Sequence, residues 1–124
     1  MNWYKRAQSN IDAIRENRPR IREMSLEWAK EKGTEITPEG NLVLFHGTSP
    51  RNAKLIERTR RINAGTYFDG NSDVARRFGC MTISRGNPVV LKAIVDPSAV
   101  TGGSYWSLNE DVYLDSDNVY RPRK

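Results

Sequence analysis

The sequence predicts an α+β domain preceded by a helical extension. Apolar residues recur at helical spacing before residue 33, whereas short runs rich in β-branched residues dominate after residue 41. Glycine, proline and asparagine separate these runs, as turns require. We therefore expect residues 1–40 to form a helical extension that packs on the core, and residues 41–124 to form the main domain of mixed strands and short helices.

Two helices are predicted in the extension. Pro19 interrupts the first and suits the opening turn of the second, and Gly33 is a plausible end for the second. The stretch "GTEITPEGN" that follows reads as a polar connector. Apolar stripes at this spacing are usually buried, so we expect both stripes to pack on the core: Trp3, Ala7, Ile11 and Ile14, then Ile21, Met24 and Trp28.

The central segment predicts a strand followed by two helices. "NLVLF" is a buried strand, and Ser49 with Pro50 forms an N-cap and first helical position for a helix that runs to about Arg60. "INAGTYFDG" is a short extended stretch. Asn71 or Ser72 then caps a second short helix, which we expect to end at Gly79.

The remaining residues predict strands. "CMTIS", "PVVLKAIV", "DVYLD" and "NVYRP" combine β-branched or aromatic residues with flanking turn residues. The intervening "VTGGSYWSLN" reads as a flexible loop that exposes Tyr105 and Trp106. The order of elements, β-α-β-α-β-β-β, is that of a mixed α/β or α+β domain.

Composition restricts the function classes. The chain has 124 residues, enough for one domain with a real core, and no apolar run approaches the ~18 residues of a membrane helix. The first residues show no signal-peptide pattern. Cys80 is the only cysteine and His46 the only histidine, so an internal disulfide and an ordinary zinc site are excluded. We expect a cytoplasmic protein, no membrane partner, no metal, and a buried Cys80.

The net charge of +5 is concentrated in the middle of the chain. Residues 51–77 carry seven basic and three acidic side chains. Such a patch attracts phosphates of a nucleotide or nucleic acid, although a solvated helix face explains it equally well.

Three segments place a polar or aromatic side chain where a strand meets a turn. They are "LFHGTS" with His46, "AGTYFDG" with Tyr67, and "SLNEDVYLD" with Glu110. Each has an ordinary structural explanation: a histidine capping a strand end, a half-buried tyrosine and a solvent-facing glutamate.

Taken together and in this order, the segments resemble the ADP-ribosyltransferase superfamily, in the poly(ADP-ribose) polymerase-like branch with a His-Tyr-Glu triad. The resemblance covers residues 42 to about 123. It includes Gly47 and Thr48 directly after the histidine, the Gly-x-Tyr-Phe stretch at 65–68, a second aromatic at Phe78, and Asn-Glu-x-hydrophobic at 109–112. The fold it implies is a split mixed β-sheet with short helices.

The resemblance implies that NAD is the substrate and that its nicotinamide–ribose bond is cleaved. Gly47 would pair with the carboxamide, and Tyr67 and Phe78 would sandwich the nicotinamide ring. His46 would bind a ribose hydroxyl of the adenosine half, with Thr48 adding a second hydroxyl contact. Glu110 would stabilise the oxocarbenium-like ribose and orient the acceptor. The catalytic residues would be Glu110, His46 and Tyr67; the NAD-binding residues would be His46, Gly47, Thr48, Tyr67 and Phe78.

Two departures refine this expectation. Ala75 replaces a carboxamide-binding serine of larger relatives, and Leu108 stands where arginine-modifying toxins carry a second acid or a glutamine. We therefore expect a monomer that mono-ADP-ribosylates a protein or nucleic-acid acceptor. A domain this small resembles free effectors of bacteria or their viruses, such as toxins or host-modifying proteins, for which an antitoxin or inhibitor protein would be a further partner. The alternatives are a non-catalytic basic nucleic-acid-binding module, an NAD glycohydrolase, an ADP-ribose-binding relative and an NAD-using RNA 2′-phosphotransferase. The last of these needs a second histidine.

Overall fold

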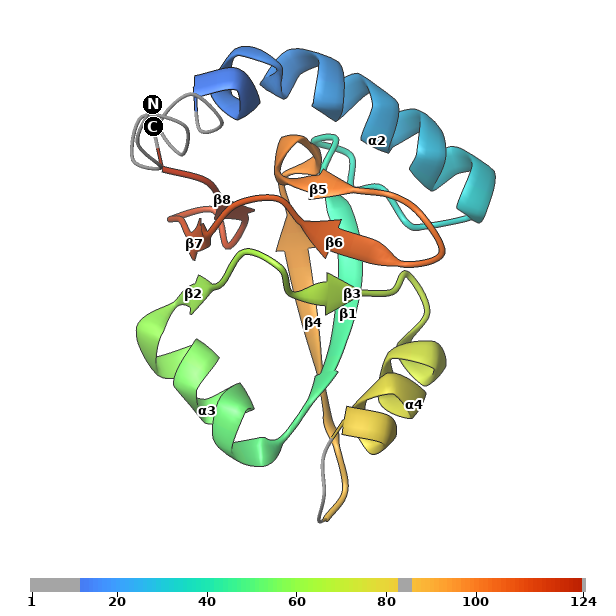
Figure 1. Cartoon of the computed structure of the whole chain (residues 1–124), viewed down its shortest axis with the longest axis vertical. Helices are drawn as coiled ribbons and strands as arrows, with labels where there is room; N and C mark the ends of the chain where they lie inside the picture. The colour runs from blue at the N-terminus through green and yellow to red at the C-terminus, as the bar shows by residue number, and fades with distance from the viewer. Residues whose placement is uncertain (1–11, 83–85, 124) are drawn as a thin grey trace, which may run out of the picture.

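The computed structural model describes residues 12–82 and 86–123, and within them the chain is α+β, as predicted. Two sheets lie along the long central antiparallel pair of β1 and β4, with helices above and on both sides (Figure 1). Of the first predicted apolar stripe, Trp3, Ala7 and Ile11 lie outside the described residues, whereas residues 12–16 are helical.

The larger sheet has five strands in the order β1-β4-β8-β7-β2. Their bounds are β1 Leu42–Thr48, β4 Val89–Val95, β8 Tyr120–Arg121, β7 Val112–Leu114 and β2 Arg61–Ile62. β1 and β4 pair antiparallel over their full length, from Leu42 opposite Val95 to Thr48 opposite Val89. β4 and β8 are parallel, so the sheet is mixed. The predicted strands "NLVLF", "PVVLKAIV", "DVYLD" and "NVYRP" are confirmed.

The smaller sheet has three strands in the order β3-β6-β5: β3 Tyr67–Phe68, β6 Trp106–Leu108 and β5 Val100–Thr101. Tyr67 lies opposite Ser107. A reciprocal pair of backbone hydrogen bonds between Phe45 and Asp69, of 2.8 and 2.9 Å, joins this sheet to β1. This junction brings the end of the "LFHGTS" strand beside the "GTYFDG" segment.

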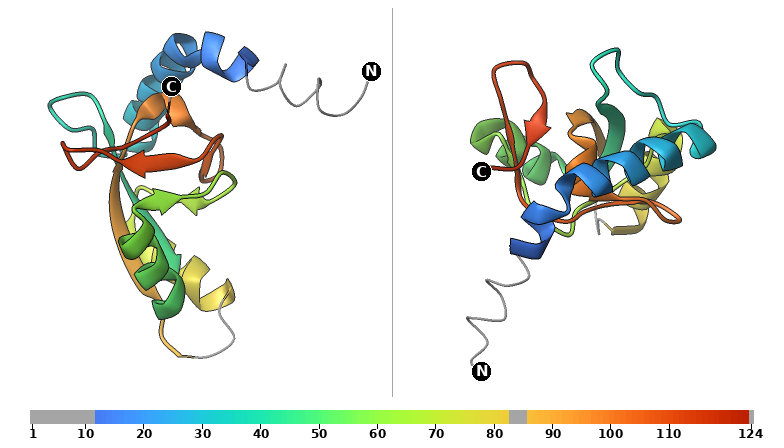
Figure 2. Two further views of the ribbon diagram at one scale, coloured as in Figure 1. Left: turned by 90° about the vertical axis from the view of Figure 1, so that its left-hand side faces the viewer. Right: turned by 90° about the horizontal axis from the view of Figure 1, so that it is seen from above.

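Helix α2, Arg18–Lys32, crosses the top of the molecule and packs on the 3-10 turn η1, Pro97–Ala99, and on β5 (Figure 2). Pro19 stands in its first turn and Gly33 ends it in the left-handed conformation, with φ 72°, as predicted. Residues 35 and 36 then pair with β1, through the Val43 N–H to the Glu35 carbonyl and the Ile36–Leu42 bridge.

The buried face of α2 differs from the predicted stripe. Ser25 and Ala29 are buried, whereas Met24 is 60 % and Trp28 39 % exposed. The cause is the close approach of α2 to η1 and β5: the Ser25 hydroxyl donates to the Val100 carbonyl at 2.9 Å, which only a small polar side chain allows. The larger apolar side chains therefore lie at the rim of the contact.

Helix α3, Pro50–Thr59, begins as predicted: the Ser49 hydroxyl accepts from the Asn52 N–H at 3.1 Å. It ends at Arg60, which takes the left-handed conformation.

Helix α4, Ser72–Thr82, begins after Asn71, whose side chain caps the N–H groups of Asp73 and Val74. The predicted end at Gly79 and the strand over "CMTIS" are wrong, because the helix continues through Thr82; residues 83–85 lie outside the description. Gly79 instead permits close packing of α4, since a Cβ there would lie 2.7 Å from the Pro88 Cβ and 3.1 Å from the Gly47 carbonyl carbon. Cys80 is exposed, contrary to expectation.

The loop predicted over 100–109 is largely ordered sheet, since it contains β5 and β6. Trp106 is completely buried and is the largest side chain of the core. It is therefore not the exposed aromatic that we expected beside Tyr105. Among the described residues, no helix has the length and apolarity needed to span a membrane.

Candidate functional site

Four of the predicted site residues line one pocket. A cavity of about 260 Å³ lies between the end of β1, β3, helix α4 and the segment before β6. Its volume is just below the ~300 Å³ at which small-molecule sites usually begin, so it fits one flat ring better than a dinucleotide. The lining residues are Phe45, His46, Gly47, Tyr67, Phe68, Asp69, Ala75, Phe78 and Tyr105.

His46 is fixed by the backbone of the neighbouring sheet. Its Nδ1 lies 2.7 Å from the Tyr67 carbonyl oxygen, and because a carbonyl only accepts, Nδ1 carries the proton. Burial lowers the pKa of His46, and the bond to the Tyr67 carbonyl only partly offsets this. The imidazole is therefore neutral at pH 7, so its Nε2 is a hydrogen-bond acceptor. Such a group suits a ligand hydroxyl.

Gly47 is required by helix packing. A Cβ at this position would lie 1.9 Å from the Ala75 carbonyl oxygen and 3.0 Å from the Gly79 nitrogen. β1 and α4 thus meet backbone to backbone through two glycines. The glycine identity at 47 follows from this contact, so the residue type by itself is no evidence for a ligand, although its backbone does line the pocket.

The aromatic wall has three rings. Tyr67 is 57 % and Phe78 42 % exposed, so both rings are accessible to a ligand. Tyr105 lies edge-on to both, with ring centroids 4.6 Å from Tyr67 and 6.0 Å from Phe78. A ligand ring sandwiched by Tyr67 and Phe78 therefore has to share the wall with Tyr105 or displace it.

Thr48 lies apart from this pocket. Its side chain is buried, with 7 % exposure, and its hydroxyl accepts a hydrogen bond from the Asn52 side-chain amide at 2.8 Å. This contact ties the end of β1 to the first turn of α3. The hydroxyl contact to a ligand that we predicted for Thr48 has no counterpart in this arrangement.

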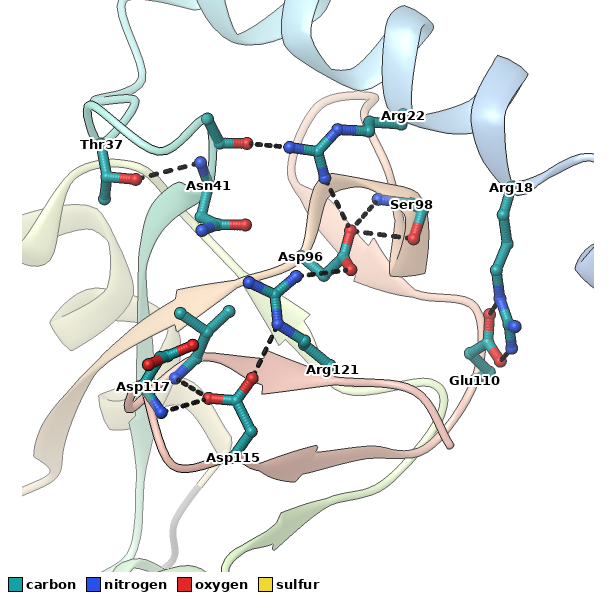
Figure 3. Close-up of polar contacts among 12 residues, drawn as sticks. Arg18, Arg22, Thr37, Asn41, Asp96, Ser98, Glu110, Asp115, Asp117 and Arg121 are labelled. Carbon is teal, nitrogen blue, oxygen red and sulfur yellow. Dashed lines mark hydrogen bonds and ion pairs between the residues drawn. The ribbon is translucent and has the colours of Figure 1, made fainter. Parts of the chain in front are cut away.

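Glu110 also lies apart from the pocket lining. Its carboxylate forms a two-point ion pair with Arg18 of α2: Nη2 contacts Oε1, and Nε donates to Oε2 at 3.2 Å (Figure 3). Both side chains are about one-fifth exposed. Glu110 follows Ser107, the partner of Tyr67, by three residues, so its Cα lies at most about 10 Å further along the chain.

A second ionic cluster lies under α2. The Asp96 carboxylate accepts from Arg22 and Arg121 at 3.2 Å each and from the Ser98 N–H and hydroxyl at 2.9 Å (Figure 3). Arg121 also donates to Asp115 at 2.7 Å. This cluster joins α2, η1 and β8, so it holds the extension to the core.

Asp69 and Tyr105 are polar residues of the pocket lining that were not among the predicted site residues. Asp69 bridges to Phe45 through its backbone, while its carboxylate accepts from the Asn71 N–H at 2.8 Å. Its place in "FDGN" signals a turn, and the sequence gives no sign that it lines a cavity. Tyr105 follows Gly102 and Gly103, where an aromatic side chain in a glycine-rich segment is a usable signal for a ring at a site.

No group of three or more His, Cys, Asp or Glu side chains is arranged to hold a metal ion within residues 12–82 and 86–123. No family model, curated protein or solved structure matches this chain.

Proposed function

We propose that the protein is an NAD-dependent mono-ADP-ribosyltransferase. One observation carries the proposal: His46, Gly47, Tyr67 and Phe78, which come from three separate segments, line a single ring-sized pocket. In the resemblance, Gly47, Tyr67 and Phe78 bind the nicotinamide, and His46 binds a ribose hydroxyl of the adenosine half.

The chemistry of the pocket supports a nicotinamide ligand. Its walls are the flat rings of Tyr67, Phe78 and Tyr105, which favour offset or edge contacts with a planar heterocycle. The neutral His46 offers Nε2 as an acceptor for a ribose hydroxyl. The adenosine half of NAD would lie outside the cavity, since its volume holds only one ring.

The proposed reaction breaks the bond between ribose C1′ and the nicotinamide nitrogen. The electron pair of that bond goes to nicotinamide, which leaves neutral, and an acceptor oxygen or nitrogen forms the new bond to C1′. The acceptor's proton passes to the Glu110 carboxylate and then to water. For this, Glu110 must leave its ion pair with Arg18, because both carboxylate oxygens are engaged there.

The Arg18–Glu110 pair also favours a second candidate function. While both of its oxygens bond to the guanidinium, the carboxylate has no free oxygen for the acceptor's proton and its charge is paired with Arg18 rather than with the ribose. A chain in which that pair persists would bind NAD or ADP-ribose at the pocket without transferring it.

Both candidate functions are tested by incubating the full chain with NAD labelled either in the nicotinamide or in the adenylate phosphate. The acceptor source is cell lysate, treated afterwards with protease or nuclease. Glu110→Gln should lower label transfer about a hundredfold or more, whereas Asp111→Asn, a neighbouring carboxylate paired with Arg61, should leave it unchanged.

The outcomes separate the functions. Label on protein or nucleic acid that depends on Glu110 supports the transferase. Nicotinamide release without transfer indicates a glycohydrolase, and NAD binding without release indicates the second candidate. Absence of NAD and nicotinamide binding, measured by ligand-observed NMR, would overturn the assignment of the pocket.

A further inference from the structure

Helix α3 carries an exposed row of positive charge. Arg51, Lys54 and Arg58 follow one another at spacings of three and four residues, so they lie on one face. All three side chains are exposed, and the buried Ala53 and Ile56 lie on the opposite face. We call Arg51, Lys54 and Arg58 the α3 basic row.

The row is not neutralised by neighbouring acids. Among the described residues, none of its three side chains takes part in an ion pair. The one acid of the helix, Glu57, lies on its flank. Burial raises the pKa of Tyr120 on β8, and the negative charge of Glu57 adds to this.

A hollow of about 560 Å³ runs beside the row and is lined by Ser49, Arg51, Asn52, Lys54, Leu55 and Arg58. Leu55 is the only large apolar side chain in this lining, so the surface lacks the apolar face with which an amphipathic helix enters a membrane. Two of the three cations are arginines, whose guanidinium groups match phosphate oxygens at two points.

We propose that the α3 basic row binds the phosphate backbone of a nucleic acid. Arg58 lies seven helical steps beyond Arg51, a rise of about 10 Å, so the three cations are spaced to contact neighbouring phosphates of one strand. The contacts are to the backbone, so binding is independent of base sequence and sensitive to salt. This inference goes beyond the proposed function and holds whether or not the pocket takes NAD.

Fluorescence anisotropy of the full chain with a labelled single-stranded oligonucleotide of about 20 nucleotides tests the proposal. The variant Arg51→Gln/Lys54→Gln/Arg58→Gln should weaken binding at least tenfold at about 50 mM salt. It should also reduce the slope of log affinity against log salt by about 2, since each lost phosphate contact contributes roughly 0.7.

The matched control removes three exposed cations from the N-terminal region and α2 instead: Arg15→Gln/Arg20→Gln/Lys30→Gln. Both variants lower the net charge from +5 to +2, so a loss confined to the α3 variant supports the row. Equal losses in the two variants, or no loss in either, would overturn the proposal.

Competition identifies the partner class. Polyglutamate or anionic phospholipid vesicles that displace the oligonucleotide at equal charge concentration would contradict a nucleic-acid surface. Circular dichroism confirms that each variant keeps its helices before binding is compared. Nicotinamide binding is measured on the same samples. A variant that loses oligonucleotide binding but keeps nicotinamide binding shows that the α3 basic row and the pocket are tested separately.

Discussion

The pocket and the ionic cluster under α2 differ in whether their polar side chains find hydrogen-bond partners within the protein. In the cluster, the Asp96 carboxylate accepts four hydrogen bonds, so nothing is left for a ligand. In the pocket, the His46 Nε2 makes no hydrogen bond with any residue that the structure describes, and Tyr67 and Phe78 are half exposed. The difference indicates that the cluster holds the fold together and the pocket is open to a partner.

Glu110 has features of both regions. Its sequence motif associates it with the pocket, but its ion pair with Arg18 gives it the same kind of contact as the cluster residues. Variants of these residues distinguish side chains that stabilise the fold from side chains that bind a ligand.

The largest effect is expected for Gly47→Ala, at the floor of the pocket. The new Cβ would lie 1.9 Å from a backbone oxygen that cannot rotate away, so β1 and α4 must separate. We expect a loss of at least about 3 kcal/mol in the free energy of unfolding and a Tm more than ~10 °C lower. Gly103→Ala is the control, because its Cβ would meet only the Tyr105 carbonyl oxygen, at 3.7 Å. Similar melting temperatures for the two variants would contradict the packing role.

Asp96→Asn should weaken the attachment of α2 while leaving the pocket intact. The carboxylate is 13 % exposed and bonded to two arginines, so we expect a loss of about 2 kcal/mol in urea unfolding. Asp111→Asn breaks the exposed pair with Arg61 and should cost less than about 1 kcal/mol. Nicotinamide binding should be unchanged in both variants; its loss in Asp96→Asn would show that the two regions are coupled.

A double-mutant cycle of Arg18→Gln and Glu110→Gln measures what their ion pair contributes. Because both side chains are about one-fifth exposed, we expect a coupling free energy of about 1 kcal/mol. If Glu110 is catalytic, Arg18→Gln should retain or increase transferase activity, whereas Glu110→Gln abolishes it. Equal loss of activity in both single variants would make the pair itself the functional unit.

The smallest effect concerns the protonation of His46. Its pKa is lowered by burial, so protonation is harder in the folded than in the unfolded chain. The resulting stability is present above the unfolded pKa of about 6.5 and is lost as the pH falls through the folded value. The wild type should therefore lose more stability than His46→Asn between pH 7.5 and 5, as measured by urea unfolding. NAD binding should weaken over the same range, because a protonated His46 can no longer accept from a ribose hydroxyl.

Local signals in the sequence predicted the helix starts and the long strands. Ser49 with Pro50, Asn71, and Gly33 act through their own backbone neighbourhood, so their roles can be read without the fold. Gly79 misled because a glycine that permits a tertiary contact has the same appearance as one that ends a helix. Trp106 misled because its neighbours Gly102 and Gly103 suggest a loop, whereas its burial depends on distant pairing with β3.

The site was predictable to a similar degree. His46, Gly47, Tyr67 and Phe78 were found from motifs, and the structure brings them to one cavity. The contact between Arg18 and Glu110 joins residues 92 positions apart and follows from how α2 lies on the core, which no local pattern encodes.

The paired glycines at 47 and 79 determine how this site can change over evolution. A floor made of main chain offers no side chain to exchange, so substitutions there break the protein before they alter its ligand. Variation in what the cavity accepts must therefore come from its rim, where Tyr105 contributes a ring and Gly103 has room for a side chain, since a Cβ there would meet only the Tyr105 carbonyl oxygen at 3.7 Å.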